Sequence, residues 1–453
     1  MKPTWSKNFT RRDFLATTTA ASALAFSFLP SRVWGANERL RIAGIGVGGK
    51  GSSDIDQAGA LGDVVALCDC DDNPLAEKLK KWPSAKKFHD FREMFDKMGK
   101  EIDAVTISTP DHTHAIAAAE AMVRKIHCYV QKPLTHDVWE ARYLRTLARK
   151  YKVATQMGNQ GSAADGLRRG VEAIQAGVIG PVREAHVWTN RPVWPQSPTI
   201  KARPTEAMPV PPTLNWDMFI GTAPMRPYHK AYHPFNWRGW WDYGTGALGD
   251  MACHTANLAF RALKLTVPTL VEAKNEPLNP ETFPGWASVI YHFPARGSMP
   301  PVKLYWYEGK LPSGEKNLPP KELFHGNEPP GSGSLLVGEK GIMYSPNDYG
   351  AQWMLLPEKS FEDWQPPAPT IPRNGRDDPG MKEEWVAAIK GGPAPYADFE
   401  FAADMTESIL LGNVAMLAGG RIEWDSEKLR VKNNRDAQKW IKRQYRKGWK
   451  MPS

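Results

Sequence analysis

The chain has 453 residues, which is enough for two domains with cores of their own. Hydrophobic residues make up 42% and charged residues 24%, so the composition argues against a disordered or fibrous chain. The net charge is +9, but residues 1–35 hold five basic residues against one acidic residue, and the remainder lacks a nucleic-acid-binding signature. After residue 35 no apolar run reaches the roughly 18 residues of a membrane helix, so we expect no membrane span in the mature protein.

Residues 1–36 have the organisation of an export leader. The sequence TRRDFL precedes a small and apolar run from Ala16 to Leu29 and a small-residue exit near Gly35. Paired arginines followed by Phe-Leu resemble a twin-arginine signal, which implies export of a folded protein by the twin-arginine translocation machinery. We therefore expect a periplasmic or otherwise exported bacterial protein. Export by the general secretory route and an amphipathic N-terminal helix are the alternatives.

From Arg39 onward, short apolar stretches alternate with helical ones. The stretches LRIAGIGVG, DVVALCD, DAVTIST, IHCYVQ and KVATQMG are rich in β-forming residues, and segments such as HAIAAAEAMVRK between them have a helical composition. Strand, helix and strand repeated at this spacing predict a doubly wound parallel sheet with helices on both faces. We assign this Rossmann-type domain to residues 37–160.

A glycine-rich turn follows the first predicted strand directly. Gly46, Gly48 and Gly51 form G-x-G-x-x-G, in which glycine allows a tight turn, close approach to a pyrophosphate and close packing of the next helix. Asp69 ends the second predicted strand, where a carboxylate accepts a hydrogen bond from a ribose 2′-hydroxyl and repels a 2′-phosphate. These residues predict a dinucleotide site that takes NAD in preference to NADP.

Two further segments stand at the carboxyl ends of predicted parallel strands, where such sheets hold their ligands. Their candidate cofactor-binding residues are Thr109, Pro110 and His114 in STPDHTH, and Gln131 and Lys132 in QKP. Proline restricts the backbone before it and so presents Lys132 at a defined angle. We expect no metal at the H-x-H pair, because residues two apart at a helix start point in different directions.

Beyond about Asn159 the alternation of strand and helix ends. A helical GLRRGVEAIQAG is followed by PVREAHVWTN, TLVEAKN, WASVIYHF, PVKLYWYE and GSLLVGEKGIMYS, which are strand-like and joined by Pro- and Gly-rich loops. We predict an α+β domain over residues 161–453. A helix beginning near Ala247 carries Asp250 and His254 four residues apart on one face. A satisfied core histidine and a carboxylate that complements the helix dipole are the structural alternatives.

Aromatic and polar side chains gather near this helix and at the end of the first strand of the second domain. Indole faces cover the C–H faces of sugar rings, while Asn and Arg reach hydroxyl groups, so we expect a wall that binds carbohydrate. The residues are Trp188, Asn190, Arg191, Trp194, Trp237, Trp241 and Tyr243. Packing in the core or between subunits explains any single one of them equally well.

In content and order, GIGVGGKG, CDCDD, STPDHTH, QKP and GTGALGDMACH resemble the Gfo/Idh/MocA oxidoreductase family. The resemblance implies a Rossmann domain and a C-terminal α/β domain with an open, mostly antiparallel sheet, often used for contacts in a homo-oligomer. It also implies NAD(P)-dependent chemistry on sugars or cyclitols, with Lys132, Asp250 and His254 as the catalytic residues. One position departs from the pattern, because Gln131 replaces the Glu of E-K-P. We expect the loss of that carboxylate to disfavour the charged form of Lys132.

An export leader on an NAD-binding protein limits the reaction. The space outside the inner membrane holds no dependable pool of NAD, so we predict tightly bound NAD that is reduced and reoxidised within each cycle. Oxidation of a ring hydroxyl on a sugar or glycoside would begin the cycle. It would continue by elimination and hydration, which together hydrolyse the glycoside, or by reduction of a second sugar. In the hydride step His254 would act as base, Asp250 would orient the groups, and Lys132 would polarise the developing oxyanion.

Elimination requires a second base, for which His229, His233 and Tyr243 are candidates. Two alternatives to the redox-neutral enzyme stay open. One is a simple sugar or cyclitol dehydrogenase that an outside acceptor reoxidises. The other is a periplasmic carbohydrate-binding or sensor protein that holds NAD as a structural ligand.

Overall fold

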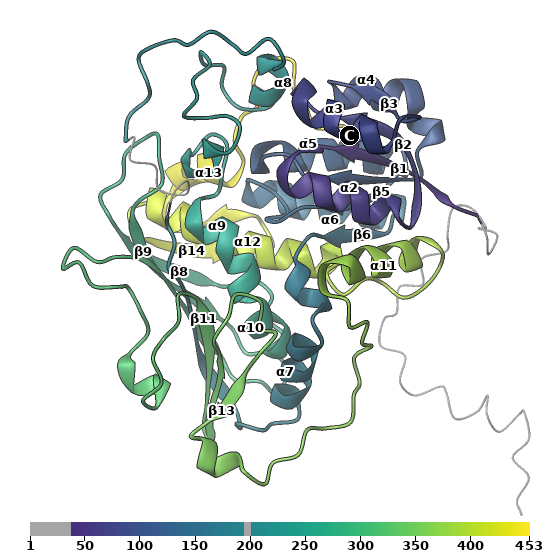
Figure 1. Ribbon diagram of the computed structural model, residues 1–453. Coiled ribbons are helices and arrows are strands. Elements are labelled where there is room, and N and C mark those ends of the chain that lie inside the picture. Colours follow the sequence, from purple (N-terminus) through teal and green to yellow (C-terminus); the bar gives the residue numbers. More distant parts are fainter. Residues whose placement is uncertain (1–37, 194–200) are drawn as a thin grey trace, which may run out of the picture.

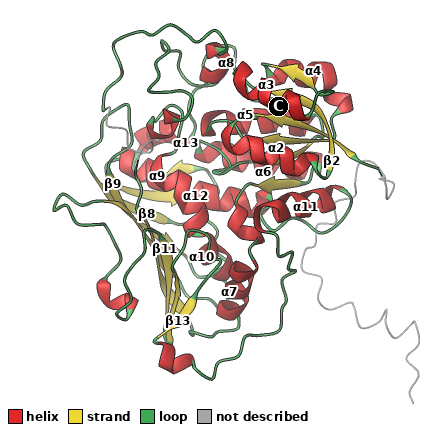
Figure 2. Cartoon of the chain, viewed as in Figure 1, coloured by secondary structure: helices red, strands yellow, loops and turns green. Residues whose placement is uncertain are grey.

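The computed structural model describes residues 38–193 and 201–453, so the expected leader at residues 1–36 lies outside the described residues. The chain forms two sheets, each packed with helices (Figure 1). Strands and helices alternate in one part, and helices lie against a long sheet in the other (Figure 2). A parallel Rossmann domain followed by a domain with a mostly antiparallel sheet confirms the predicted fold class.

The first sheet is parallel throughout, with the strand order β3-β2-β1-β4-β5-β6. Its strands are β1 (Leu40–Ile45), β2 (Gly62–Cys68), β3 (Lys86–Phe88), β4 (Ala104–Ile107), β5 (His127–Val130) and β6 (Thr155–Met157). Its helices are α2 (Gly49–Gly59), α3 (Asp72–Lys81), α4 (Phe91–Met98), α5 (Asp111–Val123) and α6 (Val138–Tyr151). Every residue of β4 and β5 is buried, because helices cover both faces. The strand order reverses between β1 and β4, and this leaves a crevice at their carboxyl ends.

The second sheet has the order β13-β12-β11-β7-β10-β9-β8-β14-β15, and its pairs are antiparallel apart from β7 with β10. Its strands are β7 (Val182–Thr189), β8 (Leu270–Asn275), β9 (Trp286–Phe293), β10 (Val302–Gly309), β11 (Gly333–Gly338), β12 (Gly341–Ser345), β13 (Met354–Leu356), β14 (Arg421–Asp425) and β15 (Arg430–Val431). Alternate residues of β9 are buried and half-buried, as expected where helices cover only one face.

The remaining helices are α7 (Asp165–Gln175), α8 (Trp216–Ile220), α9 (Gly246–Thr255), α10 (Asn257–Ala262), α11 (Asp377–Ile389), α12 (Phe399–Leu417) and α13 (Gln438–Ile441). Short 3₁₀ turns are η1 (Gly99–Glu101), η2 (Gln160–Ala163), η3 (Asn236–Gly239), η4 (Lys321–Phe324), η5 (Glu358–Phe361) and η6 (Arg435–Ala437). Helices α9, α10 and α12 lie along the second sheet (Figure 1). Within the described ranges, none of the helices combines the length and apolar character needed to cross a membrane.

The chain returns to the Rossmann domain after completing most of the second sheet. Helix α11 lies beside α2 (Figure 1). Its Met381, Trp385 and Ile389 share one buried cluster with Ile42 and Ile55. Trp385 is fully buried, with its ring edge-on to Tyr129 at a centroid distance of 5.8 Å. The domain boundary at residue 160 stays a prediction. The core of the Rossmann domain, however, includes a helix from much later in the chain.

We expect Trp385→Ala to lower the free energy of unfolding by about 3–5 kcal/mol, because the substitution leaves a large cavity in the Rossmann core. Lys390→Ala, at an exposed position just after the same helix, should change it by less than about 0.5 kcal/mol. Urea unfolding followed by circular dichroism measures both. Equal stability of the two variants would contradict a structural role for α11 in the first core.

Candidate active site

A cavity of about 690 Å³ lies between the Rossmann sheet and helix α9. Residues that the sequence predicted for the cofactor and for catalysis line it from both domains. They are Gly46, Gly48, Asp69, Thr109, Pro110, His114, Gln131 and Lys132 from the first domain, and Asp250 and His254 from α9. The cavity therefore brings the predicted dinucleotide residues and the predicted catalytic residues to one place.

The glycine turn at the start of α2 is shaped for close contact with a ligand. Gly46 has φ +72°, and a Cβ there would lie 2.7 Å from the Ser108 carbonyl oxygen. Gly51 does not line the cavity, but a Cβ there would lie 1.8 Å from the Gly46 carbonyl oxygen, so it lets α2 approach the turn. The N-cap Gly48 offers no side-chain acceptor and the first turn has no acidic residue, which leaves its N–H groups available to a phosphate.

Beyond the glycine turn, the part of the cavity lined by the Rossmann domain is acidic. Asp69 accepts hydrogen bonds from the backbone N–H of Val47 (2.8 Å) and of Asp71 (3.0 Å), which fix both carboxylate oxygens. Burial raises the pKa of Asp69, while the two N–H donors oppose that shift. Asp71 lines the cavity beside it. The arrangement fits a ribose hydroxyl, so the residues present fit NAD.

Lys132 and Asp250 meet across the cavity. The ammonium group lies 2.5 Å from Asp250 Oδ1 and donates to the Asp250 carbonyl oxygen at 2.8 Å. Lys132 follows β5 in the first domain and Asp250 belongs to α9 in the second, so the ion pair joins the domains. Both side chains are mostly buried, with 17% and 16% of their surface exposed.

His254 lies one helical turn beyond Asp250 and is 5% exposed. Burial first, and the positive charge of Lys132 second, lower the pKa of His254 to about 3, so its imidazole is neutral at ordinary pH. Its Nδ1 lies 3.3 Å from the side-chain oxygen of Asn159. We assign the N–H to Nδ1 on this contact, which leaves the lone pair on Nε2 as a proton acceptor.

Gln131 points away from the Lys132 ammonium group. Its Nε2 donates to Asp54 Oδ2 at 2.8 Å, and its Oε1 accepts from the backbone N–H of Lys132 at 3.4 Å. The carboxylate beside Lys132 is that of Asp250. Asp250, from a different segment of the chain, therefore supplies a carboxylate beside Lys132 although Gln131 replaces the Glu of E-K-P.

Comparison with known proteins identifies the family. Residues 40–159 match the family model described as oxidoreductase family, NAD-binding Rossmann fold, and residues 193–298 match the oxidoreductase family's C-terminal alpha/beta domain. The chain belongs to the Gfo/Idh/MocA oxidoreductase family. Its first domain is an NAD-binding domain.

A curated relative, the UDP-N-acetylglucosamine 3-dehydrogenase of Acidithiobacillus ferrooxidans, is 29% identical over 125 residues, which are 26% of this chain and 37% of the relative. The WlbA dehydrogenase of Bordetella pertussis, solved with NADH and UDP-GlcNAcA, has a TM-score of 0.59 at 16% identity, over 86% of this chain and 99% of that one. The aldose-aldose oxidoreductase of Caulobacter crescentus has a TM-score of 0.56 at 14% identity, over 85% and 100%. These structures share the fold.

Of the residues predicted to bind carbohydrate in this Gfo/Idh/MocA protein, Arg191 and Trp237 line the cavity. Asn190 is exposed at the end of β7 and lies away from it. Trp188 is fully buried between Phe324 and Tyr344, because it faces the interior of the second domain. Trp194 lies outside the described residues.

Trp241 and Tyr243 are also placed elsewhere. The Trp241 ring packs at a tilt of 39° against Phe283, with a centroid distance of 3.8 Å, and lines a separate cavity of about 430 Å³. Tyr243 is fully buried in an aromatic cluster, and burial raises its pKa far above the ordinary value, so it is a poor second base. The substrate-wall prediction therefore needs correction for Trp188, Asn190, Trp241 and Tyr243. Residue type alone did not distinguish cavity walls from core.

Four residues around His254 are among those that were not predicted. Asn159 holds His254, and Gln160, Asp348 and Tyr349 line the cavity near it. The Tyr349 ring stands perpendicular to the His254 ring, with centroids 5.1 Å apart. Asn159 and Gln160 lie two and three residues after β6, so the rule that ligands gather at strand ends could have found them. Nothing in the local sequence marks the loop that carries residues 348 and 349.

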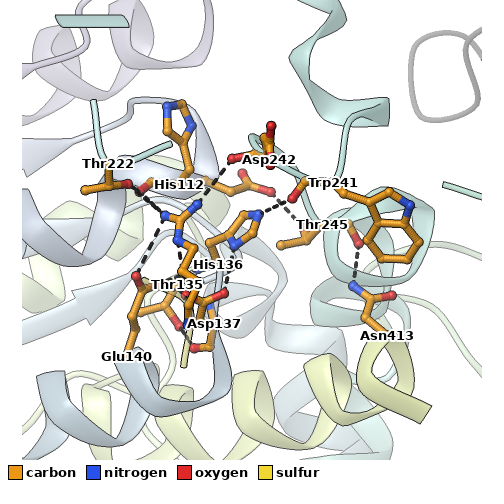
Figure 3. Close-up of polar contacts among 12 residues, drawn as sticks. His112, Thr135, His136, Asp137, Glu140, Thr222, Trp241, Asp242, Thr245 and Asn413 are labelled. Atoms are coloured by element: carbon orange, nitrogen blue, oxygen red, sulfur yellow. Dashed lines mark hydrogen bonds and ion pairs between the residues drawn. The ribbon is translucent and has the colours of Figure 1, made fainter. Parts of the chain in front are cut away.

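The start of α9 is fixed from two sides (Figure 3). Thr245 donates to Asp111 Oδ2 at 2.7 Å, and Asn413 of α12 donates to the Thr245 carbonyl oxygen at 2.9 Å. On the same side of the helix, His136 contacts the Trp241 carbonyl oxygen at 3.0 Å. These contacts tie the helix that carries Asp250 and His254 to the Rossmann domain.

The two histidines of the H-x-H pair point apart, as their spacing predicted. His112 contacts the Phe219 carbonyl oxygen at 2.9 Å, whereas the two ring nitrogens of His114 contact the carbonyl oxygens of Pro133 and Thr109. Over residues 38–193 and 201–453, no group of three or more His, Cys, Asp or Glu side chains is arranged to hold a metal ion.

We expect the His254 imidazole to remain neutral from pH 8 down to about 3. An unfolded histidine takes up a proton near pH 6.5, so lowering the pH from about 6.5 toward 3 should destabilise the fold through this residue. Histidine-selective NMR, with assignment by His254→Gln, measures the titration. Lys132→Met removes one cause of the low pKa and should raise it. A His254 resonance that titrates near 6.5 in the unsubstituted protein would contradict the assignment.

Proposed function

We propose that the protein is an oxidoreductase of sugars or glycosides that keeps NAD bound and returns it to its starting state in each cycle. The observation that carries the proposal is a segment of the second domain that is hydrogen-bonded to the Rossmann domain beside the dinucleotide end of the cavity. In it, Asn215 N–H donates to the Cys70 carbonyl oxygen at 2.8 Å, and the Thr213 carbonyl oxygen accepts from Asp72 N–H at 2.9 Å. We call residues 213–215 the strap.

The strap pairs with residues 70–72, directly after the strand end that carries Asp69. Further along the same segment, Met218, Phe219 and His233 line the cavity. A dinucleotide held by Asp69 would therefore lie next to a segment whose backbone is hydrogen-bonded to the domain that holds the dinucleotide. Release of the cofactor requires these bonds to break, which supports slow dissociation.

The catalytic residues are suited to move a proton during oxidation of a hydroxyl group. NAD, when bound, accepts the hydride that leaves the substrate carbon. His254, neutral and with Nε2 free to accept, takes the hydroxyl proton. Lys132 supplies positive charge where the hydroxyl oxygen becomes negative, and Asp250 fixes the lysine. Return of the hydride and the proton completes a redox-neutral cycle.

Unsatisfied groups in the cavity wall support a polyhydroxylated substrate. Gln160 Oε1 and Asp348 Oδ1 are buried and have no hydrogen-bond donor among the described residues, and Arg191 Nε there has no acceptor. A molecule that both donates and accepts many hydrogen bonds would satisfy these atoms once their side chains turn toward the cavity. The names of the curated relative and of the two solved structures point to the same substrate class, since each concerns a sugar or a sugar nucleotide.

Export and assembly belong to the same proposal. The pattern of residues 1–36 supports passage through the twin-arginine machinery and a periplasmic location. Trp286 and Ile290 of β9 are half-buried on the sheet face opposite the buried residues, which supports a homo-oligomer formed through that face. A retained cofactor explains how an exported enzyme works without a free NAD pool.

We expect many turnovers per protein molecule when the dialysed protein is incubated with glycosides and free sugars and no nicotinamide is added. Mass spectrometry of the products separates hydrolysis from exchange between two sugars. His254→Ala should lower the rate by about 10²- to 10⁴-fold and leave sugar affinity largely intact, because it removes the base only. Conversion that stops at one equivalent with NADH absorbance would identify a dehydrogenase that needs an outside acceptor. Binding without conversion would identify a sensor.

We expect Asp72→Pro to speed NAD dissociation about two- to tenfold, because it removes the N–H that binds the strap. Asp72 is the first residue of α3, where proline is tolerated. The matched control Asp72→Ala keeps the N–H and, like the proline variant, removes the side-chain pairings of Asp72 with Lys87 and His89. Displacement of bound NADH by excess NAD, followed by fluorescence, gives both rates. Equal rates for the two variants would argue against retention by the strap.

A further inference from the structure

Four charged side chains form a compact cluster beside the cofactor cavity. Asp54 and Lys50 belong to α2, while Asp378 and Lys382 belong to α11 (Figure 1). Lys382 lies 2.8 Å from Asp54 and 2.9 Å from Asp378, and Lys50 lies 3.0 Å and 2.6 Å from the same two carboxylates. The side chains of Asp54 and Lys382 have no exposed surface. Two positive and two negative charges balance within the cluster.

Asp54 is also the member that contacts the proposed catalytic site. Its Oδ2 accepts from Gln131 Nε2 at 2.8 Å and from Ser108 Oγ at 2.9 Å. Gln131 in turn accepts, through Oε1, from the backbone N–H of Lys132. A continuous path of hydrogen bonds therefore runs from the charge cluster to the residue whose ammonium group meets Asp250.

We propose that Asp54 is the positioning residue for Lys132, and that it acts through Gln131. The proposal rests on the proposed function in one respect, because that function gives Lys132 its role. The buried carboxylate fixes the amide of Gln131 with its nitrogen inward and its oxygen toward the Lys132 backbone. The lysine side chain is thereby held toward Asp250 before any ligand binds.

The path requires one carboxylate and one amide, since two carboxylates at these positions would face each other at about hydrogen-bond distance. Gln131→Glu leaves the buried cluster with an extra negative charge, whereas Asp54→Asn leaves it with an extra positive charge. The double variant Asp54→Asn/Gln131→Glu exchanges the two groups and restores the balance. Geometry and charge therefore predict that the two substitutions compensate each other.

The test compares the unsubstituted protein, the two single variants and the double variant. The pH dependence of acetylation of the Lys132 amine, located by peptide mass spectrometry, reports its titration without any catalytic activity. We expect the midpoint to rise in Gln131→Glu and to fall in Asp54→Asn, each by at least about half a pH unit, and to return in the double variant. Shifts of opposite sign that cancel are not expected from general loosening of the fold.

Asp56→Asn is the matched control. Asp56 lies two residues along α2, pairs with Lys78 and Lys81, and does not line the cavity. It should leave the Lys132 midpoint unchanged. If Asp54→Asn does not fold, Gln131→Glu and the double variant still decide, because the double variant should unfold at the higher temperature.

Shifts of the same sign, additive effects in the double variant, or an equal effect of Asp56→Asn would overturn the proposal. A protein that shows the compensating shifts but turns over no sugar would refute the proposed function and leave the Asp54–Gln131–Lys132 path standing. A protein that turns over sugar but shows no compensating shifts would refute the Asp54–Gln131–Lys132 path and leave the proposed function standing.

Discussion

The ion pair between Lys132 and Asp250 is the contact on which the arrangement of the site depends. It joins a loop of the Rossmann sheet to the helix that carries His254, across the cavity that both domains line. A lysine and a carboxylate taken out of water must be paired and hydrogen-bonded to be tolerated. The pairing thus fixes the distance between the dinucleotide end and the imidazole. The neutral state of His254 follows partly from the same lysine, whose charge opposes protonation nearby.

Other buried polar and charged side chains hold the two partners of this ion pair in position. The start of α9 is fixed through Thr245 to Asp111 in the Rossmann domain and through Asn413 to α12. The other partner, Lys132, directly follows Gln131, whose side-chain amide donates a hydrogen bond to Asp54. Each side of the pair is thus supported by contacts from a different part of the chain. In the proposed function, groups held in this way are already in place before a substrate arrives, which limits the reorganisation that the reaction requires.

Local rules explain which parts could be predicted from the sequence. The glycine turn, Asp69 and the strand ends follow from spacing within one βαβ unit, and the i, i+4 pair on α9 follows from helix geometry. The short strand β3 was missed because its sequence, KKF, has two exposed lysines and no apolar run. Lys50 and Asp378 are 328 residues apart, so no window along the chain relates them. Trp188 and Trp237 look alike in sequence, but the first lies in a packed strand and the second in the 3₁₀ turn η3, where it lines the cavity.

The strap and the proposed catalytic residues bear on the proposed chemistry together. A dehydrogenase that exchanges its cofactor at every turnover gains from an open dinucleotide site, whereas the proposed function assigns to the backbone hydrogen bonds at residues 70–72 a slowing of that exchange. Slow cofactor exchange does not limit turnover when the hydride returns to carbon before the cofactor leaves, because the turnover rate then depends only on groups inside the cavity. A base such as His254, which is neutral over the whole ordinary pH range, suits both directions of such a cycle. It can accept the hydroxyl proton during oxidation and, once protonated and destabilised by burial and by Lys132, is a strong acid for returning it.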